Sequence, residues 1–398
     1  MTLVDHHDPK NFRSQLLPLF FLTSIFFLNF TIRIIISPLL PTITEDMNLT
    51  RDQAGSFFLI SASGYFIALL CSGFVSSRLL HKKTIALAAI GSGMALAAAG
   101  LSQNLMAMRL GLFGVGMASA LYLPSGIAVL TSSTDTRNWG KAIGIHELAP
   151  NLSFLLTPII CEGLLLWLSW RNVLLLVGMT SISLGFAFYK FSTVKDFKGE
   201  SPHLKSFLPL AATPSFWMMM ALFTAGVTGT LGVYSMLPLY LVKEHGLLQT
   251  DANTLMTLSR MFTLPMPFVV GWLSDRFGLK PILAVVLIIT GLSTLLLGAF
   301  TGSFLMVIIF IQPPASVSFF PPAFAALSLI GSRETRNIMV SFTIPIAFLI
   351  GGGLVPNLIG IFGENDFFPL GFMLAGGFIM AGAALPAFLK FREEHSTL

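Results

Sequence analysis

Two arginines lie inside long apolar stretches of the sequence, where a charged side chain is costly. Arg33 stands in LNFTIRIIISPL and Arg260 in TLSRMFTLPMP, each seven residues from one end of its stretch. At the helical rise of about 1.5 Å per residue, each guanidinium would lie about 10 Å below the membrane surface. A buried arginine costs at least about 2.5–3.5 kcal/mol, so it should face a watery cavity or a partner. The alternative is that each long side chain reaches back to the membrane surface.

Polar neighbours favour the first explanation. Asn29, Arg33 and Ser37 follow one another at intervals of four residues and form a polar stripe on a helix. Thr257, three residues before Arg260, begins a similar stripe. Guanidinium groups hold carboxylates, phosphates and related oxyanions through paired hydrogen bonds. The two stretches therefore predict a binding site for a small anion.

A histidine and a glutamate share a third apolar stretch. Glu147 is the carboxylate that lies well inside such a stretch, and burial would favour its neutral form. A neutral carboxyl suits a proton carrier, whereas an ionised one would be a counter-charge for an arginine. His146 titrates near neutral pH and could share the proton. We expect Glu147 and His146 to couple transport to protons; the alternative is a pair at the membrane surface that contacts Lys141 or Arg137.

Aromatic and polar side chains on other apolar stretches are expected to complete the cavity: Tyr65, Tyr122, Thr228, Tyr234 and Gln312. The sequence has no nucleotide-binding loop, no clustered Cys and His ligands and no nucleophile–base arrangement. We therefore expect no enzyme activity, no metal and no cofactor.

The elements that position these residues follow from composition. The 398 residues are 54% hydrophobic and 10% charged, and the mean hydropathy is +0.82. Soluble domains carry about 25% charged residues, so a cytosolic enzyme, a disordered protein and a nucleic-acid binder are excluded. Apolar runs near the membrane-spanning length of about 20 residues recur along the chain, and a helix satisfies its own backbone hydrogen bonds in lipid. Twelve transmembrane helices are predicted: 15–40, 54–77, 84–102, 105–132, 142–165, 171–190, 214–241, 253–274, 281–300, 304–330, 338–360 and 369–389.

Basic residues predict how these helices are oriented. With alternating spans, 17 of the 23 Lys and Arg residues fall on one side and 4 on the other. Cytoplasmic loops carry the excess of Lys and Arg, so both termini should be cytoplasmic in a bacterial inner membrane. The bias also accounts for the net charge of +5. Cys71 and Cys161 both stand in apolar runs and are expected to be buried, without a disulfide.

The chain reads as two copies of one half. The segment from Gly73 to Arg78 aligns with that from Gly271 to Arg276 at an offset of 198 residues. We predict an N-terminal six-helix bundle at 1–190, a cytoplasmic linker at 191–213 and a C-terminal six-helix bundle at 214–398. Two parallel repeats place a cavity between them near the membrane midplane, which rocking would open to one side at a time.

The chain resembles the major facilitator superfamily through a loop signature, G-x-x-x-D-R-x-G-x-K. The second copy matches at Gly271, Asp275, Arg276, Gly278 and Lys280; the first keeps Gly73 and Arg78 but has Ser77 in place of the acid. The resemblance implies that Asp275 lies against a helix N-terminus of the opposite half and latches the cytoplasmic side. Gly73, Arg78, Gly271, Asp275 and Arg276 are therefore expected to act in gating.

The expected function is secondary active transport of a small anion by alternating access, coupled to protons as a symport. The paired arginines look like those of the organic-anion, monocarboxylate and nitrate/nitrite branches of the superfamily. Two alternatives remain: a proton-coupled exporter of lipophilic compounds, and a membrane receptor that does not transport. The expected partners are the anion, protons and membrane lipid, with no nucleic acid, and the protein is expected to be a monomer.

Overall fold

The chain folds almost entirely into helices. The computed structural model describes residues 12–135, 138–194, 196–199, 213–330 and 333–389. Within these ranges β-structure is limited to an isolated bridge between Leu80 and Lys198. Residues 200–212 of the predicted linker, together with Arg137, lie outside the described residues.

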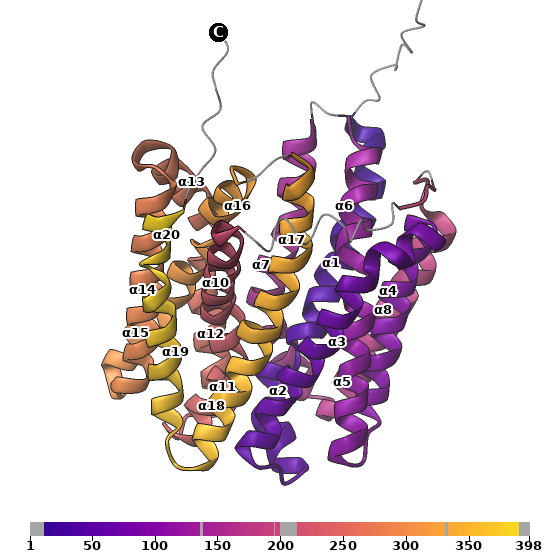
Figure 1. The fold of residues 1–398 in the computed structure, drawn as a ribbon. Helices are drawn as coiled ribbons and strands as arrows, with labels where there is room; N and C mark the ends of the chain where they lie inside the picture. Colours follow the sequence, from indigo (N-terminus) through magenta and orange to yellow (C-terminus); the bar gives the residue numbers. More distant parts are fainter. Residues whose placement is uncertain (1–11, 136–137, 195, 200–212, 331–332, 390–398) are drawn as a thin grey trace, which may run out of the picture.

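The helices fall into two groups along the sequence (Figure 1). The first group comprises α1 (Phe12–Ile34), α2 (Ile36–Asp46), α3 (Arg51–Arg78), α4 (His81–Gly100), α5 (Leu105–Ala120), α6 (Tyr122–Ser133), α7 (Trp139–Leu165) and α8 (Trp170–Phe191). The second comprises α10 (Pro214–Val227), the π-helix η3 (Thr228–Gly232), α11 (Val233–Lys243), α12 (Gln249–Met261), α13 (Met266–Phe277), α14 (Leu279–Ala299), α15 (Gly302–Val317), α16 (Phe320–Ser328), α17 (Arg333–Leu349), the π-helix η4 (Ile350–Leu354), α18 (Val355–Glu364), α19 (Phe368–Gly382) and α20 (Leu385–Phe388).

Eleven helical segments of the described residues are long and apolar enough to cross a membrane. They correspond to eleven of the twelve predicted spans, and the first, Leu16–Asp46, runs six residues beyond its predicted end. The predicted eighth span is divided, because α12 ends at Met261 and α13 begins at Met266. Pro265 and Pro267 lack the backbone N–H that a continuous helix needs there. The all-helical membrane architecture is confirmed, with a broken helix in place of the eighth span.

The packing of the second group repeats that of the first. α4 packs against α8 as α14 packs against α19, and α1 packs against α7 as α10 packs against α17. The helices α3 and α12 begin at residues 51 and 249, an offset of 198 that equals the offset between the two loop motifs. We refer to the helices of residues 12–191 and of residues 214–388 as the N-half and the C-half.

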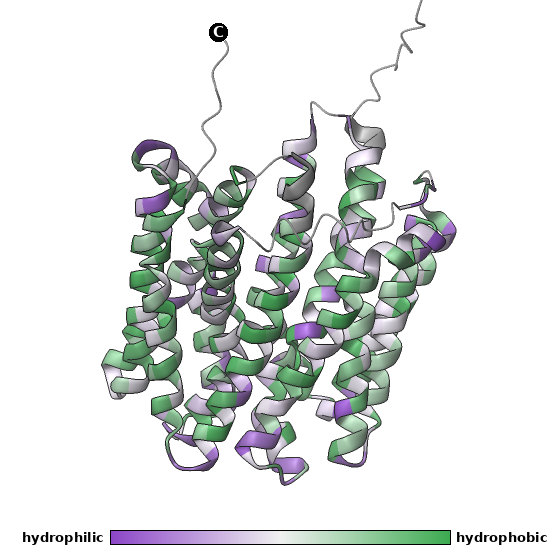
Figure 2. Ribbon diagram, viewed as in Figure 1, coloured by the Kyte–Doolittle hydropathy of each residue, from purple (hydrophilic) through white to green (hydrophobic). Residues whose placement is uncertain are grey.

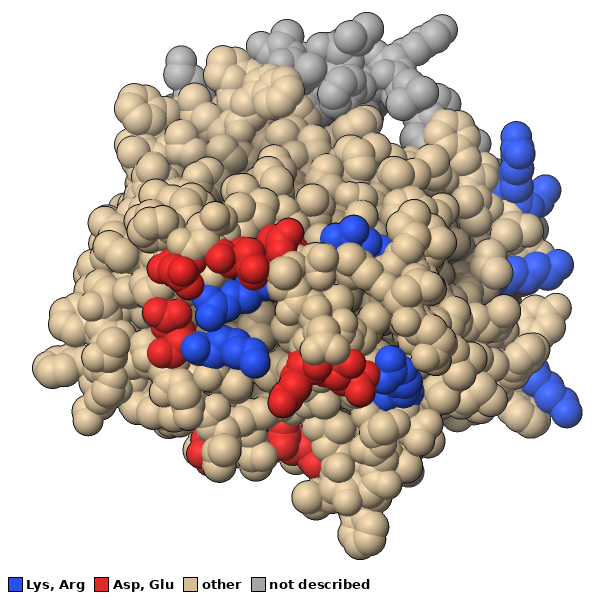
Figure 3. All heavy atoms as spheres, turned by 90° about the horizontal axis from the view of Figure 1, so that it is seen from below, with Lys and Arg blue, Asp and Glu red and all other residues tan. Residues whose placement is uncertain are grey.

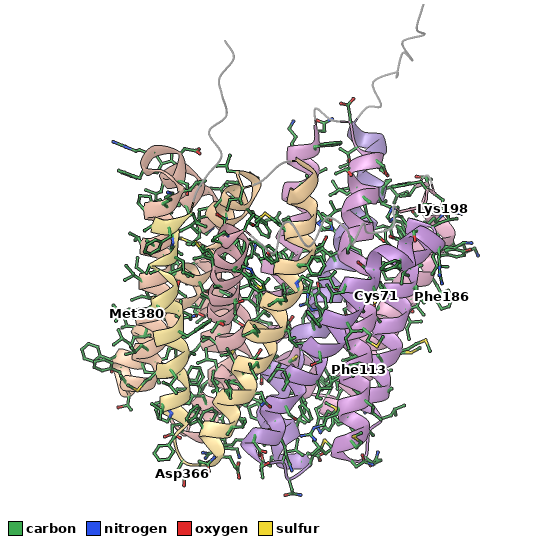
Figure 4. The ribbon with its side chains drawn as sticks, viewed as in Figure 1. Cys71, Phe113, Phe186, Lys198, Asp366 and Met380 are labelled. Atoms are coloured by element: carbon green, nitrogen blue, oxygen red, sulfur yellow. The ribbon has the colours of Figure 1, made fainter. Side chains whose placement is uncertain are left out.

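The two ends of the molecule differ in how the halves meet. α1 begins and α20 ends at the upper end in Figure 1, which we call the terminal end. The opposite, distal end carries the turns α2–α3 and α18–α19, with Asp366 at its edge (Figure 4). Extensive contacts between the halves join α3 to α17, η4 and α18, α7 to α12, and α2 to α11 and α12. None of these extensive contacts in the described chain involves α6, α13 or α16, which lie toward the terminal end.

Glycines let the backbones of α3 and α18 touch at the distal end. A Cβ atom added to Gly360 would lie 2.5 Å from the carbonyl oxygen of Arg51, and one added to Gly55 would lie 2.9 Å from that of Pro356. Both distances are too short for any side chain larger than hydrogen. The halves are therefore closed against each other at this end.

Hydropathy is distributed as expected for helices that cross a membrane. Apolar residues cover the long sides of the molecule and hydrophilic residues gather at its two ends (Figure 2). The expectation that both cysteines are buried is wrong for Cys71, which is exposed on α3, whereas Cys161 on α7 is buried. An exposed thiol on an apolar helix face is what a lipid-covered surface allows.

Candidate functional site

Arg33 lies near the middle of the first membrane span, at the end of α1. Thirteen residues separate it from Asp46 at the end of the span, which is about 20 Å at the helical rise. This depth is about twice the predicted one, because the span is longer than predicted, and it is too great for the side chain to reach the distal surface. The guanidinium carbon instead lies 4.0 Å from the centroid of the Tyr65 ring, 4.7 Å from that of Phe348 and 5.1 Å from that of Phe30.

The aromatic surroundings of Arg33 come from both halves. Phe30 and Tyr65 belong to α1 and α3, whereas Phe348 belongs to α17. A cavity of about 40 Å³, room for a few water molecules, borders Arg33 and is also lined by Ser61, Ser235 and Gly352. Arg33 therefore lies at the boundary between the two halves.

Arg260 occupies the corresponding depth in the C-half. It lies eleven residues from the start of α12 at Gln249, about 16 Å along the helix, and is 3% exposed. Its guanidinium carbon lies 4.2 Å from the ring centroid of Phe154 on α7 and 5.0 Å from that of Tyr234 on α11. One nitrogen, Nη2, donates to the carbonyl oxygen of Thr230 at 3.3 Å. The guanidinium therefore lies between the halves, against an aromatic ring of the N-half.

A pair of phenylalanines connects the two arginines. The rings of Phe30 and Phe154 meet edge to face with centroids 5.2 Å apart. Arg33 lies over the first ring and Arg260 over the second. The two guanidinium groups thus approach one aromatic pair from opposite halves.

Neither guanidinium is neutralised within the described part of the chain. The ion pair found there joins Arg171 to Asp46, and His146 with Glu147 forms a second one when the imidazole is protonated. Around Arg260, three buried polar atoms have no hydrogen-bond partner among the described residues: its own Nη1, the Tyr234 hydroxyl and Thr257 Oγ1. Buried polar atoms are nearly always bonded in folded proteins, so these three leave hydrogen-bonding capacity at one place that a water molecule or a ligand could satisfy.

Four of the predicted cavity residues bond within their own half: Asn29, Thr228, Gln312 and Tyr122, whose bonds are described below. Asn29 Nδ2 donates to the carbonyl oxygen of Ser119 at 3.2 Å. The hydroxyl of Thr228 donates to the carbonyl oxygen of Thr224 at 2.8 Å. Gly229 lies in η3, and its carbonyl oxygen accepts from Gln312 Nε2 at 2.7 Å. The wide turn of a π-helix leaves carbonyl groups free to accept other donors, and Gln312 supplies one such donor to η3 from inside the C-half.

His146 and Glu147 form a chain of hydrogen bonds with Tyr122. His146 is fully buried; its Nε2 lies 2.9 Å from the Tyr122 hydroxyl and its Nδ1 lies 3.2 Å from Glu147 Oε1. The Tyr122 hydroxyl donates to the carbonyl oxygen of Leu22 at 2.6 Å. The imidazole also stacks on Phe26, with centroids 4.4 Å apart. The expectation that Glu147 is buried is wrong, because its side chain is 50% exposed.

Helix geometry shows where the exposed carboxylate points. Glu147, Phe154 and Pro158 lie seven and four residues apart on α7 and share one face. Phe154 on that face touches Tyr234 of the C-half. Glu147 therefore lies on the face of α7 that contacts the C-half at Phe154, but nearer the terminal end, where the extensive contacts between the halves stop.

The predicted gating residues lie at the terminal end. Asp275 and Arg276 are exposed near the end of α13, and the guanidinium of Arg276 lies 5.6 Å from the Trp272 ring centroid. Gly271 on α13 has open space around it, while Gly73 and Arg78 lie in the last two turns of α3. Within the described residues, Asp275 makes no ion pair with the N-half.

Sequence reasoning missed the phenylalanines that surround the arginines. Phe30, Phe154 and Phe348 are three of 37 phenylalanines, and nothing in their spacing distinguishes them from packing residues. A partial signal was available, since Phe30 lies one turn before Arg33 on the same helix. The unpaired hydroxyl of Tyr234 could not be inferred without its neighbours.

Curated relatives match only part of the chain. A probable L-galactonate transporter of Escherichia coli (strain K12) is 23% identical over 37% of this chain and 33% of its own length. A probable sulfoacetate transporter of Cupriavidus necator is 23% identical over 42% of this chain and 39% of its own length. The matched segments thus span about a third to two fifths of these relatives.

Solved structures match over nearly the whole chain. A bacterial homologue of the human lysosomal transporter Spinster, inward-facing and occupied, has a TM-score of 0.76 at 19% identity and covers 96% of this chain and 97% of its own. The unoccupied form has a TM-score of 0.78, again at 19% identity, and covers 96% of this chain and 98% of its own. The fold is therefore shared with transporters. The model of the Major Facilitator Superfamily matches residues 20–266 and 233–397. The chain thus belongs to the Major Facilitator Superfamily.

Proposed function

We propose that the protein transports a small organic anion by alternating access, with Arg33 and Arg260 as its anion-binding groups. One observation carries the proposal: two guanidinium groups from opposite halves face one interface, and no carboxylate of the described residues lies within 4.0 Å of either. A charge without a partner in a membrane interior is costly unless a ligand neutralises it. An anion that binds both halves would supply that neutralisation.

The names of the relatives support an anionic substrate. Galactonate carries a carboxylate, and sulfoacetate carries a carboxylate and a sulfonate; both are oxyanions that a guanidinium binds by paired hydrogen bonds. The aromatic rings beside Arg33 and Arg260 restrict the direction from which an oxyanion can approach. We propose that the substrate is a small oxyanion of this kind.

Alternating access would use the difference between the two ends. The distal end is closed by backbone contact between α3 and α18, whereas the helices near the terminal end lack extensive contacts across the halves. We place the terminal end in the cytoplasm of a bacterial inner membrane, following the basic residues of the sequence. An anion bound by both arginines would draw the halves together around it, which is the step that a transporter needs before opening the other side.

Coupling to protons is proposed for Glu147 and His146. A hydroxyl has one hydrogen, and that of Tyr122 is donated to Leu22, so the hydroxyl accepts from His146 Nε2. The remaining contact, between Nδ1 and the Glu147 carboxylate, needs one proton, carried by either group. Loss of that proton would leave two lone pairs facing each other and break the contact. Proton release would thereby free Glu147, which lies on the face of α7 that contacts the C-half at Phe154.

Counterflow in proteoliposomes tests the anion proposal. Labelled L-galactonate and sulfoacetate would be the first probes, followed by other small carboxylates and sulfonates. Arg33→Gln and Arg260→Gln should each weaken exchange, because each removes one guanidinium from the interface. Arg109→Gln is a matched control, since this arginine bonds the hydroxyl of Ser56 inside the N-half at 2.8 and 3.0 Å. Unchanged apparent affinity in both interface variants would refute the proposal.

The same assay separates the two alternatives. An exporter of lipophilic compounds would exchange uncharged or cationic aromatic solutes and would tolerate loss of either arginine. The phenylalanine rings around Arg33 are the observation that favours this alternative. A receptor would bind a solute without exchanging it across the vesicle.

A further inference from the structure

Two glutamates at the distal end contact the first turn of a helix in the opposite half. Figure 3 views this end, where acidic and basic side chains gather near the middle of the face. Glu162 lies in the last turn of α7 in the N-half, and Glu364 is the last residue of α18 in the C-half. Their partners are α12 and α3, which occupy equivalent positions in the two halves.

Glu162 binds side chains at the start of α12. Its Oε1 accepts from Gln249 Nε2 at 3.2 Å and from Asn253 Nδ2 at 2.6 Å, and its Oε2 accepts from Thr250 Oγ1 at 3.1 Å. A carboxylate at a helix N-terminus is also favoured by the helix dipole. One carboxylate thus holds three side chains of the C-half.

The same amide side chains extend the contact to α2. Gln249 Oε1 accepts from the backbone N–H of Thr42 at 3.1 Å and from its hydroxyl at 2.7 Å. Asn253 Nδ2 also donates to the carbonyl oxygen of Pro38 at 3.0 Å. Glu162 therefore orients the two residues that tie α12 to a second helix of the N-half.

Glu364 of the C-half binds the start of α3 in the N-half. Its Oε2 accepts from the backbone N–H of Arg51, the first residue of α3, at 2.7 Å. Arg51 Nη1 donates to the carbonyl oxygen of Gly363 at 2.5 Å. The first N–H groups of a helix have no partner within the helix, so a carboxylate from outside satisfies one of them.

We propose that Glu162 and Glu364 are a pair of gating residues that keep the distal end closed, and that both contacts break when this end opens. The contacts are reciprocal: each half supplies one carboxylate and one helix N-terminus. The proposal rests on alternating access, but it does not depend on the charge of the substrate.

Cys161 provides a reporter for opening. It is fully buried beside Glu162, on the same face of α7 as Phe154, which contacts Tyr234 of the C-half. Opening of the distal end would expose its thiol. In a Cys71→Ser background, which removes the exposed cysteine, the rate of labelling by a hydrophilic maleimide in lipid nanodiscs measures opening. Labelling after denaturation gives the total thiol for each variant.

Each alanine substitution should accelerate labelling of Cys161. We expect Glu162→Ala and Glu364→Ala to raise the rate at least about tenfold, the change that corresponds to about 1.4 kcal/mol, and the double variant to exceed both. Glu45→Ala is the control, because it removes an exposed carboxylate from the same end. Rates within about twofold of the background for both single variants and the double variant would overturn the proposal, because the contacts would then contribute almost nothing to closure of the distal end.

Glutamine variants keep the size of the glutamate side chain, so they test the contacts with less risk of misfolding than alanine. Glu162→Gln places an amide nitrogen against one of three donors and should accelerate labelling. Glu364→Gln keeps an oxygen that can accept from Arg51 N–H, so its effect should be smaller. Accelerated labelling without any effect of Arg33→Gln or Arg260→Gln on anion exchange would support the gating pair and refute the anion proposal. The reverse pattern would refute the gating pair alone.

Discussion

Replacement of Arg260 by methionine should make the protein more stable and bind its anion less tightly. The buried guanidinium makes one hydrogen bond to a neutral carbonyl, at 3.3 Å, and its Nη1 has no partner among the described residues. Replacing buried ion pairs by apolar side chains of similar volume is often neutral or stabilising by about 1–4 kcal/mol. We take the same range for Arg260, whose desolvation is not offset by an ion pair among the described residues. Loss of the contacts with the Phe154 and Tyr234 rings offsets about 1–2 kcal/mol of that gain.

The two effects can be read in one thermal-unfolding experiment. The middles of these two ranges leave a net gain of about 1 kcal/mol, and their extremes allow at most about 3 kcal/mol. Unfolding entropy grows with chain length, so a gain of about 1 kcal/mol raises the Tm of a chain of this size by about 1 °C. A charge-assisted hydrogen bond contributes about 1.5–3 kcal/mol, so anion affinity should fall roughly ten- to hundredfold. Purified protein would be heated with and without L-galactonate or sulfoacetate, because a ligand that binds the folded state raises the Tm.

Two further variants sharpen the result. Arg260→Lys keeps the charge but loses the planar donor fork, so it should weaken anion binding without raising the stability of the free protein. Arg109→Met removes an arginine that bonds Ser56, and it should leave the ligand-induced shift intact. A lower Tm for Arg260→Met, together with an unchanged ligand-induced shift, would show that Arg260 is a structural residue and would refute the reasoning.

Three other predictions follow from the same contacts. Glu147→Gln cannot release a proton, so accumulation driven by a pH gradient should cease while counterflow persists; intact accumulation would remove Glu147 from the coupling mechanism. Tyr122→Phe leaves buried His146 Nε2 without its acceptor and should cost about 1–3 kcal/mol, seen as a lower Tm. Gly278→Ala strains a backbone at φ +86° and should lower stability by about 1–2 kcal/mol, whereas Gly377→Ala, in open space on α19, should not; equal effects would contradict the backbone explanation.

Charge inside apolar sequence was the signal that could be used without a structure. It identified Arg33 and Arg260, because a guanidinium in lipid is costly whichever face of the helix carries it. It did not identify Phe30 and Phe154, which connect them, since an aromatic residue is unremarkable in a membrane helix. Glu162 was equally hidden, because a carboxylate near a helix end reads as a residue at the membrane surface.

The helical spans were predictable for a similar reason. Length and hydropathy decide whether a segment crosses a membrane, and eleven of the spans follow from them. The break between α12 and α13 and the wide turns of η3 and η4 depend on local hydrogen bonding. Composition carries little information about such bonding, although Pro265 and Pro267 marked the first of these places.

At the glycine crossing of α3 and α18, the distal end can close only because Gly55 and Gly360 have no side-chain atoms. A methyl group at Gly360 would lie 2.5 Å from the Arg51 carbonyl oxygen, well inside van der Waals contact, and backbone atoms cannot move aside as a flexible side chain can. Such a methyl would act as a wedge that holds the halves apart without removing any attractive contact. A variant held open in this way would keep its binding groups but could not alternate between its two conformations. Recognition of a solute would thereby be separated from its transport.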